Sequence, residues 1–176
     1  MIYEPREDSY LLEKSVIKYS KGKSVLDMGT GSAIQALAAK KHGAKSVLAV
    51  DINPEAVKNT KALGIDSIKS NLFEKVKGKF DLIVCNPPYL PEDSREDKES
   101  RVITSGGPRG DEFLCKFLSK AKNHLEKYGF IFIVLSSLTP RDRINQILKK
   151  SKMQKEIISS EKMSLESLEV WLIKKV

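Results

Sequence analysis

Residues 80–91 read FDLIVCNPPYLP, and this stretch decides the fold. After Asp81 the chain carries no charge for the length of a short strand, which is typical of a strand buried on both faces inside a parallel sheet. Pro87 and Pro88 then end the strand, because proline has no N–H to donate to a neighbouring strand. Asn86 is therefore placed at the carboxyl end of a central strand, where open α/β sheets bind their ligands.

The segment from Asn86 to Tyr89 suits chemistry on a planar amine, such as the exocyclic amine of adenine or a carboxamide nitrogen. Such a nitrogen is a poor nucleophile because its lone pair is delocalised. The side-chain carbonyl of Asn86 and the backbone carbonyl of Pro87 could each accept one N–H and aim the lone pair at an electrophile. Pro88 would stiffen this corner, and Tyr89 would supply a flat wall. The alternative is a strand-ending turn with a packed tyrosine, but the cofactor loop upstream favours a catalytic role.

A glycine-rich turn, GTGSA at residues 29–33, follows a predicted first strand at 23–28 and precedes a predicted helix at 34–42. Strand, glycine turn and helix begin a nucleotide-type βαβ unit. The dinucleotide pattern GxGxxG fails at Ile34, and the carboxylate of Asp27 would repel a pyrophosphate but attract an ammonium. The loop therefore favours S-adenosylmethionine, which carries an ammonium and a sulfonium and no phosphate. The residues expected to hold it here are Asp27, Gly29, Thr30 and Gly31.

Asp51 ends the second predicted strand, at 46–51, where βαβ folds place an acidic ligand of the ribose. Its carboxylate can accept both ribose hydroxyls, and Ile52 lies in the same segment. The alternative role, capping the next helix, falls to Asn53, because Pro54 suits the first helical position after it.

The third predicted strand lies within 65–72 and ends at Asn71 and Leu72. Asn71 could bond the edge of adenine, with Leu72 or Phe73 packed on the ring. An asparagine after a strand is also a common turn residue, so both interpretations stay open.

The leading segment YEPREDS, residues 3–9, runs into a predicted helix that ends near residue 19. Asp8 or Ser9 is the expected N-cap, because short polar side chains accept hydrogen bonds from the first helical N–H groups. From the residues alone, this segment, which includes Pro5, either caps a leading helix or lies across the mouth of the cofactor site.

The second half of the chain alternates polar loops with apolar elements. Residues 92–101 contain no apolar side chain and are expected to form a flap beside the site, within an insertion spanning 92–110. Asp111 is the expected N-cap of the next helix, and Thr139 with Pro140 is expected to cap another. Predicted strands follow at 130–135, 155–160 and 167–174. The order predicts one α/β domain over residues 1–176.

Composition sets the remaining limits. The chain of 176 residues is long enough for one domain with a real core. It shows no signal-peptide pattern, its apolar run at 130–135 is too short to span a membrane, and Cys85 and Cys115 form no metal or disulfide pattern. A cytoplasmic protein is expected. The net charge of +8 fits either contact with RNA or the ribosome, or a solvated lysine-rich surface.

Three segments together resemble a class I S-adenosylmethionine-dependent methyltransferase, and more narrowly the HemK family of N5-glutamine methyltransferases that act on peptide chain release factors. They are VLDMGTGS from Val25, DINPEAV from Asp51 and FDLIVCNPPY from Phe80. The resemblance implies a Rossmann-like, mostly parallel seven-stranded sheet with an antiparallel last strand and helices on both faces. It also implies that Asn86 and Pro87 hold the target amide.

Two features resemble the archaeal and eukaryotic branch of that family: the opening YEPREDSYLL and the glycines 106, 107 and 110. We also expect no helical N-terminal domain of the kind that bacterial members carry. This implies that Pro5, Asp8 and Ser9 border the cofactor, and that a small zinc-binding activator protein forms a heterodimer with the chain. Ala33 and Asn71 depart from the family pattern, which has a glycine and an aspartate there.

Three other functions would use parts of the same sequence. A methyltransferase for amines of rRNA or tRNA faces the same electronic problem and stays open. A DNA adenine methyltransferase must flip its base and read the flanking sequence, and the insertion at 92–110 is too small for that task. A non-catalytic subunit predicts a damaged Asn-Pro-Pro-Tyr motif, and this one is intact. The sequence therefore predicts methylation of the glutamine in a release factor's Gly-Gly-Gln motif, with no metal.

Overall fold

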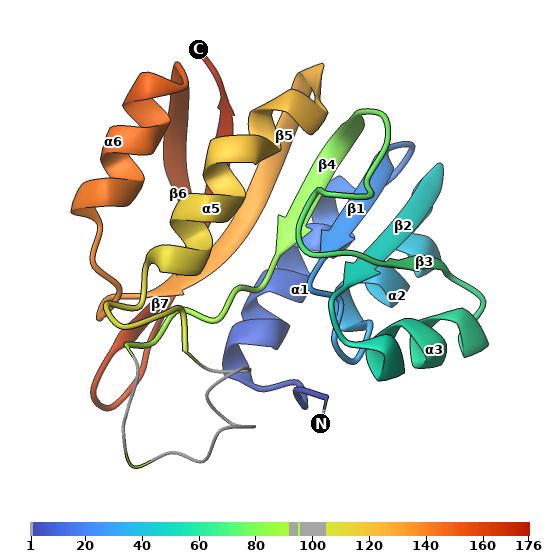
Figure 1. Cartoon of the computed structure of the whole chain (residues 1–176), viewed down its shortest axis with the longest axis horizontal. Helices are drawn as coiled ribbons and strands as arrows, with labels where there is room; N and C mark the ends of the chain where they lie inside the picture. Colours follow the sequence, from blue (N-terminus) through green and yellow to red (C-terminus); the bar gives the residue numbers. More distant parts are fainter. Residues whose placement is uncertain (1, 92–94, 96–104) are drawn as a thin grey trace.

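The computed structural model describes residues 2–91, 95 and 105–176. All described strands belong to a single seven-stranded sheet in the order β3-β2-β1-β4-β5-β7-β6 (Figure 1). The elements are α1 (Glu7–Tyr19), β1 (Ser24–Met28), α2 (Ile34–Lys41), β2 (Ser46–Asp51), α3 (Pro54–Ala62), β3 (Asp66–Lys69), β4 (Phe80–Cys85), α5 (Glu112–Ala121), the 3-10 helix η1 (Lys122–His124), β5 (Leu125–Ser136), α6 (Asp142–Lys150), β6 (Met153–Lys162) and β7 (Ser167–Lys175).

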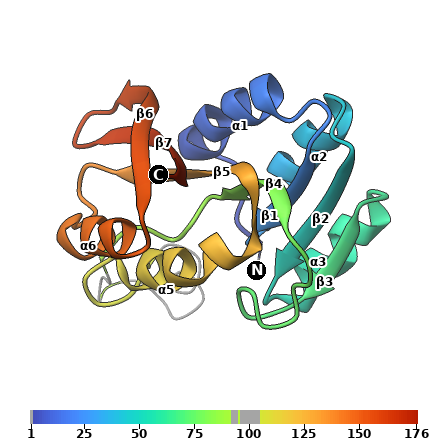
Figure 2. The same ribbon diagram turned by 90° about the horizontal axis from the view of Figure 1, so that it is seen from above.

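Strands β1 to β5 pair in parallel, whereas β7 runs antiparallel to both of its neighbours, β5 and β6. This confirms the predicted mostly parallel sheet with an antiparallel last strand. Helices α1 and α2 cover one face of the sheet, and α5 and α6 cover the other (Figure 2). The predicted coverage of both faces is therefore confirmed.

Strand β4 is apolar from Leu82 to Cys85 because of what covers it on each side. Leu82 and Val84 pack into the cluster formed with α1, while Ile83 and Cys85 pack into the cluster formed with α5 and α6. All four side chains are fully buried. Because helices cover both faces, neither set of alternate residues meets water, and the strand has no polar face.

Strand β5 is longer than the predicted 130–135, since it begins at Leu125. Gly129 lies inside it, at a place where an added Cβ would stand 2.8 Å from the carbonyl oxygen of Phe80. The pairing of β4 with β5 shifts register near the same point. Gly129 allows the backbones of β4 and β5 to approach closely, and a glycine usually interrupts a strand pattern in a sequence. The sequence pattern therefore places the start of β5 too late. Trp171, on β7, is fully buried.

Helix starts are where local prediction fails. Helix α1 begins after Arg6, so Asp8 and Ser9 lie in its first turn, and the prediction that either is the N-cap is wrong. Asp111 is the N-cap residue of α5, as predicted, but its carboxylate accepts from Arg143 and makes no capping bond. Helix α6 begins at Asp142, after Arg141 rather than after Thr139 and Pro140. At α5 and α6 the expected capping side chains have distant partners instead, Arg143 for Asp111 and the Tyr89 carbonyl for Thr139. At α1 the Ser9 hydroxyl still accepts locally, from the Arg6 N–H. Charge-assisted bonds such as that of Arg143 are stronger than neutral caps.

The predicted flap at 92–101 lies outside the described residues, apart from Arg95. Within the described ranges, no helix has the length and apolar character needed to cross a membrane.

Candidate active site

A cavity of about 530 Å³ opens at the carboxyl ends of β1, β2 and β4. Its volume lies in the range typical of sites for small molecules. The structure brings nearly all the predicted site residues into its lining: Asp8, Ser9, Asp27, Gly29, Thr30, Gly31, Asp51, Ile52, Asn71, Leu72, Asn86, Pro87, Pro88 and Tyr89. Pro5, although predicted to border the cofactor, lies outside this lining.

The glycine turn after β1 needs residues that tolerate positive φ. Gly29 and Gly31 have φ of 75° and 50°, and Ala33 has φ of 67° although it carries a side chain. The N–H groups of Gly29 and Thr30 both donate to the carbonyl of Val50, at 2.7 and 3.0 Å. The turn is therefore fastened to the end of β2, which fixes the floor of the cavity.

Asp27 lies beneath this turn and is almost completely buried. Its Oδ2 accepts from the Thr30 hydroxyl at 2.7 Å and from the Ala36 N–H at 3.2 Å. Burial, with a smaller contribution from the nearby charge of Asp51, raises the pKa of Asp27 to about 7. A cation in the cavity would therefore favour the ionised form of a carboxyl that is poised near neutral pH.

Asp51 is held by two backbone groups. Its Oδ2 accepts from the Gly31 N–H at 2.9 Å, and its Oδ1 accepts from the Asn53 N–H at 2.8 Å. Each carboxylate oxygen keeps further acceptor capacity, so a pair of ribose hydroxyls can still donate to it. Asn53 caps α3 through the Glu55 N–H, with Pro54 at the first helical position, as predicted.

The segment after β3 presents Asn71 and Leu72 to the cavity. Asn71 is exposed, and its Nδ2 donates to Glu74 Oε1 at 2.9 Å, so its carbonyl oxygen is the end left for a ligand. Leu72 has φ of 49°, and such left-handed non-glycine residues concentrate at functional sites. Phe73 is buried and stacks on Phe117, outside the cavity lining, so of the two side chains expected to pack on adenine it is Leu72 that lies at the cavity.

Asp8 joins the leading helix to the end of β4. Its buried carboxylate accepts from the hydroxyl of Tyr89 at 3.0 Å, the hydroxyl of Tyr3 at 3.1 Å and the Nδ2 of Asn86 at 3.3 Å. Asn86 Nδ2 also lies 3.2 Å from Ser9 Oγ. Burial, followed by the charge of Asp8, raises the pKa of Tyr89 and of Tyr3, so both remain hydrogen-bond donors.

The other end of the Asn86 amide is unsatisfied. Its Oδ1 is buried, and no donor reaches it from any residue that the structure describes. A buried acceptor without a partner costs about 1–3 kcal/mol, so such atoms are rare outside functional sites.

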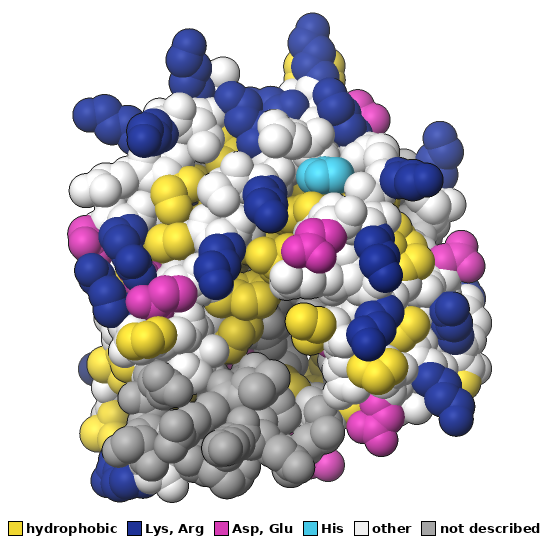
Figure 3. Space-filling model, viewed as in Figure 1, with side chains coloured by type: hydrophobic (Ala, Val, Ile, Leu, Met, Phe, Trp, Pro, Cys, Tyr) yellow, Lys and Arg dark blue, Asp and Glu magenta, His cyan; other side chains and the backbone are white. Residues whose placement is uncertain are grey.

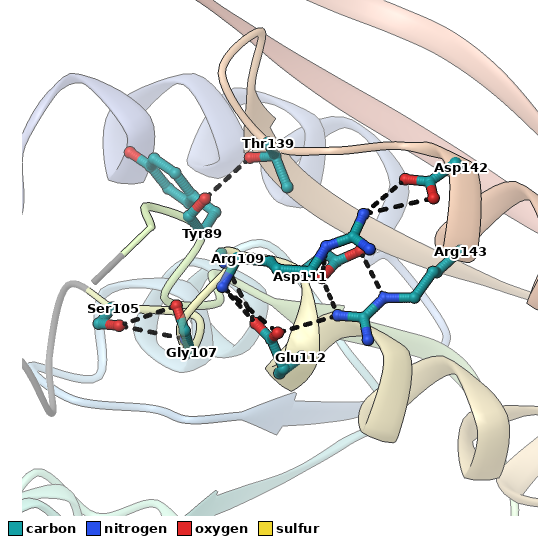
Figure 4. Close-up of polar contacts among 10 residues, drawn as sticks. Tyr89, Ser105, Gly107, Arg109, Asp111, Glu112, Thr139, Asp142 and Arg143 are labelled. Atoms are coloured by element: carbon teal, nitrogen blue, oxygen red, sulfur yellow. Dashed lines mark hydrogen bonds and ion pairs between the residues drawn. The ribbon is translucent and has the colours of Figure 1, made fainter.

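The glycine loop before α5 supports this motif from outside. An added Cβ at Gly106 would stand 2.7 Å from the carbonyl oxygen of Pro88 and would also clash with the carbonyl oxygen of Gly110. The Thr139 hydroxyl donates to the carbonyl of Tyr89 at 2.9 Å (Figure 4). Two loops therefore hold the backbone that follows Asn86.

Arg143, on α6, anchors the end of that glycine loop by bonding to the residues where α5 begins (Figure 4). Its Nε donates to Asp111 Oδ2 at 3.0 Å and its Nη2 donates to Glu112 Oε1 at 3.0 Å. Glu112 in turn accepts from the N–H groups of Arg109 and Gly110, at 3.2 and 3.1 Å. The hydrogen bonds from Arg143 hold the pKa of Asp111 below its usual value, so the anchor stays charged.

Sequence comparison places the chain in a family. It is 41% identical to a Methanocaldococcus jannaschii protein assigned to the protein N5-glutamine methyltransferases, over 96% of this chain and 89% of that protein. The chain belongs to the HemK family of N5-glutamine methyltransferases. A release factor glutamine methyltransferase of Borreliella burgdorferi is 33% identical over 73% of this chain and 51% of its own length. Mouse methyltransferase HEMK2 is 28% identical over 87% of this chain and 80% of its own.

Two broader family models also match this HemK-family chain, ribosomal protein L11 methyltransferase at residues 10–87 and Eco57I restriction-modification methylase at residues 59–165. Among solved structures, the Mtq2-Trm112 complex of E. cuniculi superposes over 99% of both chains with a TM-score of 0.78 and 23% identity. The L11 methylase of Lactobacillus delbrueckii has a TM-score of 0.70 and 27% identity, over 99% of this chain and 81% of its own. The family uses S-adenosylmethionine, and the carboxylates of Asp27 and Asp51 line the cavity.

Sequence reasoning missed the wall of this methyltransferase cavity that lies beyond Tyr89. The lining residues concerned are Leu90, Ser105, Phe113, Met163, Glu166 and Leu168. Phe113 is on the apolar stripe of a helix, and Met163 and Glu166 belong to the β6–β7 connection, so each looks locally like core or turn. Only the folding of the sheet brings them to β4, and we find no signal in the sequence that would have identified them.

Proposed function

We propose that this protein is a single methyltransferase domain that works in the cytoplasm and methylates the side-chain amide nitrogen of glutamine in the Gly-Gly-Gln motif of a peptide chain release factor. The names of its relatives support this substrate: one is a release factor glutamine methyltransferase, and the solved Mtq2-Trm112 complex is described as methylating the termination factor eRF1.

The observation that carries the proposal is the buried, unpartnered Oδ1 of Asn86. A glutamine amide nitrogen carries two N–H groups, and one can satisfy this oxygen. The backbone carbonyl of Pro87, in the same lining, is the proposed acceptor for the other. Two fixed acceptors would orient the nitrogen and increase electron density on it, which is catalysis by placement and dipoles.

The other lining residues have separate tasks in this proposal. Asp27 and Asp51 with the glycine turn hold S-adenosylmethionine, and Tyr89 forms a wall for the flat amide. The cofactor supplies an electrophilic methyl group on sulfur when it is bound. The protein contributes orientation and the exclusion of water, because the target nitrogen is a weak nucleophile that must be aimed.

A small partner protein is part of the proposal. The solved Mtq2 chain is in complex with Trm112, and this supports a heterodimer with a small zinc-binding activator for the present chain. Co-expression with such an activator should raise the yield of soluble protein and the kcat of methyl transfer. An activator that neither co-purifies with the chain nor changes kcat would refute this part.

We also propose that RNA contacts the end of the molecule opposite the cavity. Lys23 and Lys45 flank the amino ends of β1 and β2, and Lys175 reaches the start of β5, where its Nζ donates to the Leu125 carbonyl. Tyr128 is 85% exposed at the same end. Figure 3 shows dark blue side chains, which are lysine or arginine, projecting from this end of the molecule at the top of the view. Phosphate contacts would appear as RNA affinity that falls steeply with salt.

The testing experiment is methyl transfer from labelled S-adenosylmethionine, with the purified chain assayed alone and with the activator. Release factor, its Gly-Gly-Ala variant and total RNA are offered in parallel. Label in the release factor that disappears with the Gly-Gly-Ala variant is the expected result. Label in RNA alone would replace the protein substrate by a nucleic-acid amine.

A further inference from the structure

The side-chain amide of Asn86 has two ends of nearly equal shape and opposite hydrogen-bonding character. Its oxygen accepts and its nitrogen only donates. A target N–H is held only if the oxygen faces the cavity, and a turn of 180° about the last side-chain bond would present two donors to a donor. Some neighbour must therefore select one orientation over the other.

We propose that Asp8 is the positioning residue that makes this selection, an inference that rests on the proposed acceptor role of Asn86. The two oxygens of Asp8 share the Tyr3 hydroxyl, which lies 3.1 Å from each, and otherwise have different partners. Oδ1 accepts from the Ser9 backbone N–H at 2.6 Å and the Ser9 hydroxyl at 3.2 Å. Oδ2 accepts from Asn86 Nδ2 at 3.3 Å and from the Tyr89 hydroxyl at 3.0 Å. A carboxylate has no proton to donate, so the nitrogen of Asn86 must face it.

Ser9 makes the same selection a second time. Its hydroxyl proton is directed to Asp8 Oδ1, so its oxygen is left to accept from Asn86 Nδ2 at 3.2 Å. Both neighbours of the amide therefore require nitrogen on their side. The oxygen is left on the other side of the amide, where it is buried and has no partner among the described residues.

The substitution Asp8→Asn turns this arrangement into a test, because the Ser9 backbone N–H cannot reverse. The new amide oxygen must take the place of Oδ1 to accept that N–H, and the new NH2 then takes the place of Oδ2. There it meets the NH2 of Asn86, two donors face each other, and Asn86 turns over. We expect kcat to fall about 100-fold, as misplacement at a reacting centre commonly does. Asp8→Ala removes the charge without imposing the turn, so its kcat should stay about tenfold above that of Asp8→Asn.

A reciprocal exchange should restore the acceptor. In the double variant Asp8→Asn with Asn86→Asp, one oxygen of the new carboxylate accepts from the NH2 at position 8, and its other oxygen faces the cavity. Its kcat should exceed that of Asp8→Asn about tenfold. The single variant Asn86→Asp places two carboxylates together and should be worse than the double variant. A residue that merely filled space would produce neither ordering.

The experiment measures kcat, KM for the acceptor, cofactor affinity by calorimetry and Tm for these four variants, with Glu13→Gln on α1, outside the cavity lining, as the charge control. Any effect of lost charge on cofactor affinity is shared by Asp8→Asn and Asp8→Ala, so their ratio isolates orientation. Equal kcat for those two, or no gain from the exchange, would overturn the proposal. The ratio of kcat between Asp8→Asn and Asp8→Ala is equally informative if the methylated acceptor proves to be an RNA amine. Failure of the substrate assignment can therefore be distinguished from failure of the role proposed for Asp8.

A second measurement does not need turnover. The side-chain NH2 protons of Asn86, assigned by their loss in Asn86→Asp, should exchange slowly with solvent in the unaltered chain because they donate to Asp8 and Ser9. They should exchange quickly in Asp8→Asn, where they would face the cavity. Equal exchange in the two proteins would contradict the proposal.

Discussion

The two halves of the cavity differ in how their polar groups are satisfied. In the cofactor half, Asp27 and Asp51 accept hydrogen bonds from the chain's own turn, from Thr30, Ala36, Gly31 and Asn53. In the acceptor half, the oxygen of Asn86 lacks a partner within the described part of the chain. The comparison teaches that the two carboxylates of the cofactor half are held by the fold itself, whereas Asn86 in the acceptor half has an oxygen free for the proposed substrate. Gln35 Oε1 is another buried acceptor of the lining without a partner among the described residues.

The largest expected effect comes from removing that unsatisfied oxygen. Asn86→Ala should lower kcat by about 10²- to 10³-fold, the usual loss when one oriented hydrogen-bonding group is removed from a reacting centre. Cofactor affinity, measured by calorimetry, should change less than about threefold, because Asn86 belongs to the acceptor half. A change of that size is well below the 1.4 kcal/mol that corresponds to tenfold. A large loss of cofactor affinity with unchanged kcat would break the division into halves.

Asp27 tests the cofactor half through pH. Its pKa is raised by burial from 3.8 to about 7, so between these values the folded chain binds a proton that the unfolded chain has released. Stability of the free protein therefore falls as pH rises through this window, by up to about 1.4 kcal/mol per unit. An ammonium favours the carboxylate, so cofactor affinity should rise as pH increases from 5.5 to 7 and then level off.

Asp27→Asn should remove this pH dependence, weaken cofactor binding at least about tenfold and stabilise the free protein at pH 8. Calorimetry at several pH values, in buffers with different ionisation enthalpies, would detect the proton released on binding. Glu13→Gln on α1 is the matched control for loss of one carboxylate. Affinity that rises as pH falls would contradict the role assigned to Asp27.

The same division explains what the sequence could predict. The cofactor half comes from a single βαβ unit, so the spacing of Asp27, the glycines and Asp51 is readable along the chain. The acceptor half joins Asp8 to Asn86 across 78 residues, and no local pattern encodes that contact. The choice between Leu72 and Phe73 could not be made from the sequence for a related reason. A large apolar side chain after a strand can face either the ligand or the core, and Phe73 packs against Phe117.

Gly106→Ala probes the support of the acceptor half. No Cβ fits between the carbonyls of Pro88 and Gly110, so the loop must move, at a cost of about 1–3 kcal/mol in stability. Because the displaced backbone follows Asn86, kcat should fall further than cofactor affinity. The matched control is Gly78→Ala, which has open space around it but φ of 85°, and which should cost about 1 kcal/mol without changing kcat. Equal effects on kcat from both variants would show that the loop gives Asn86 no specific support.

Ala33→Gly should produce the smallest effect and sharpens the comparison from the cofactor side. Ala33 holds φ of 67°, so glycine would relieve strain of about 1–2 kcal/mol. Glycine also loses more conformational entropy on folding, about 0.5–1 kcal/mol, and the buried Ala33 methyl group packs against Ala36 and Ala49, a contact worth about 0.8 kcal/mol. These terms nearly cancel, so denaturant unfolding should shift by less than about 1 kcal/mol. A loss of several kcal/mol would mean that the methyl group, rather than the glycines, sets the shape of the turn.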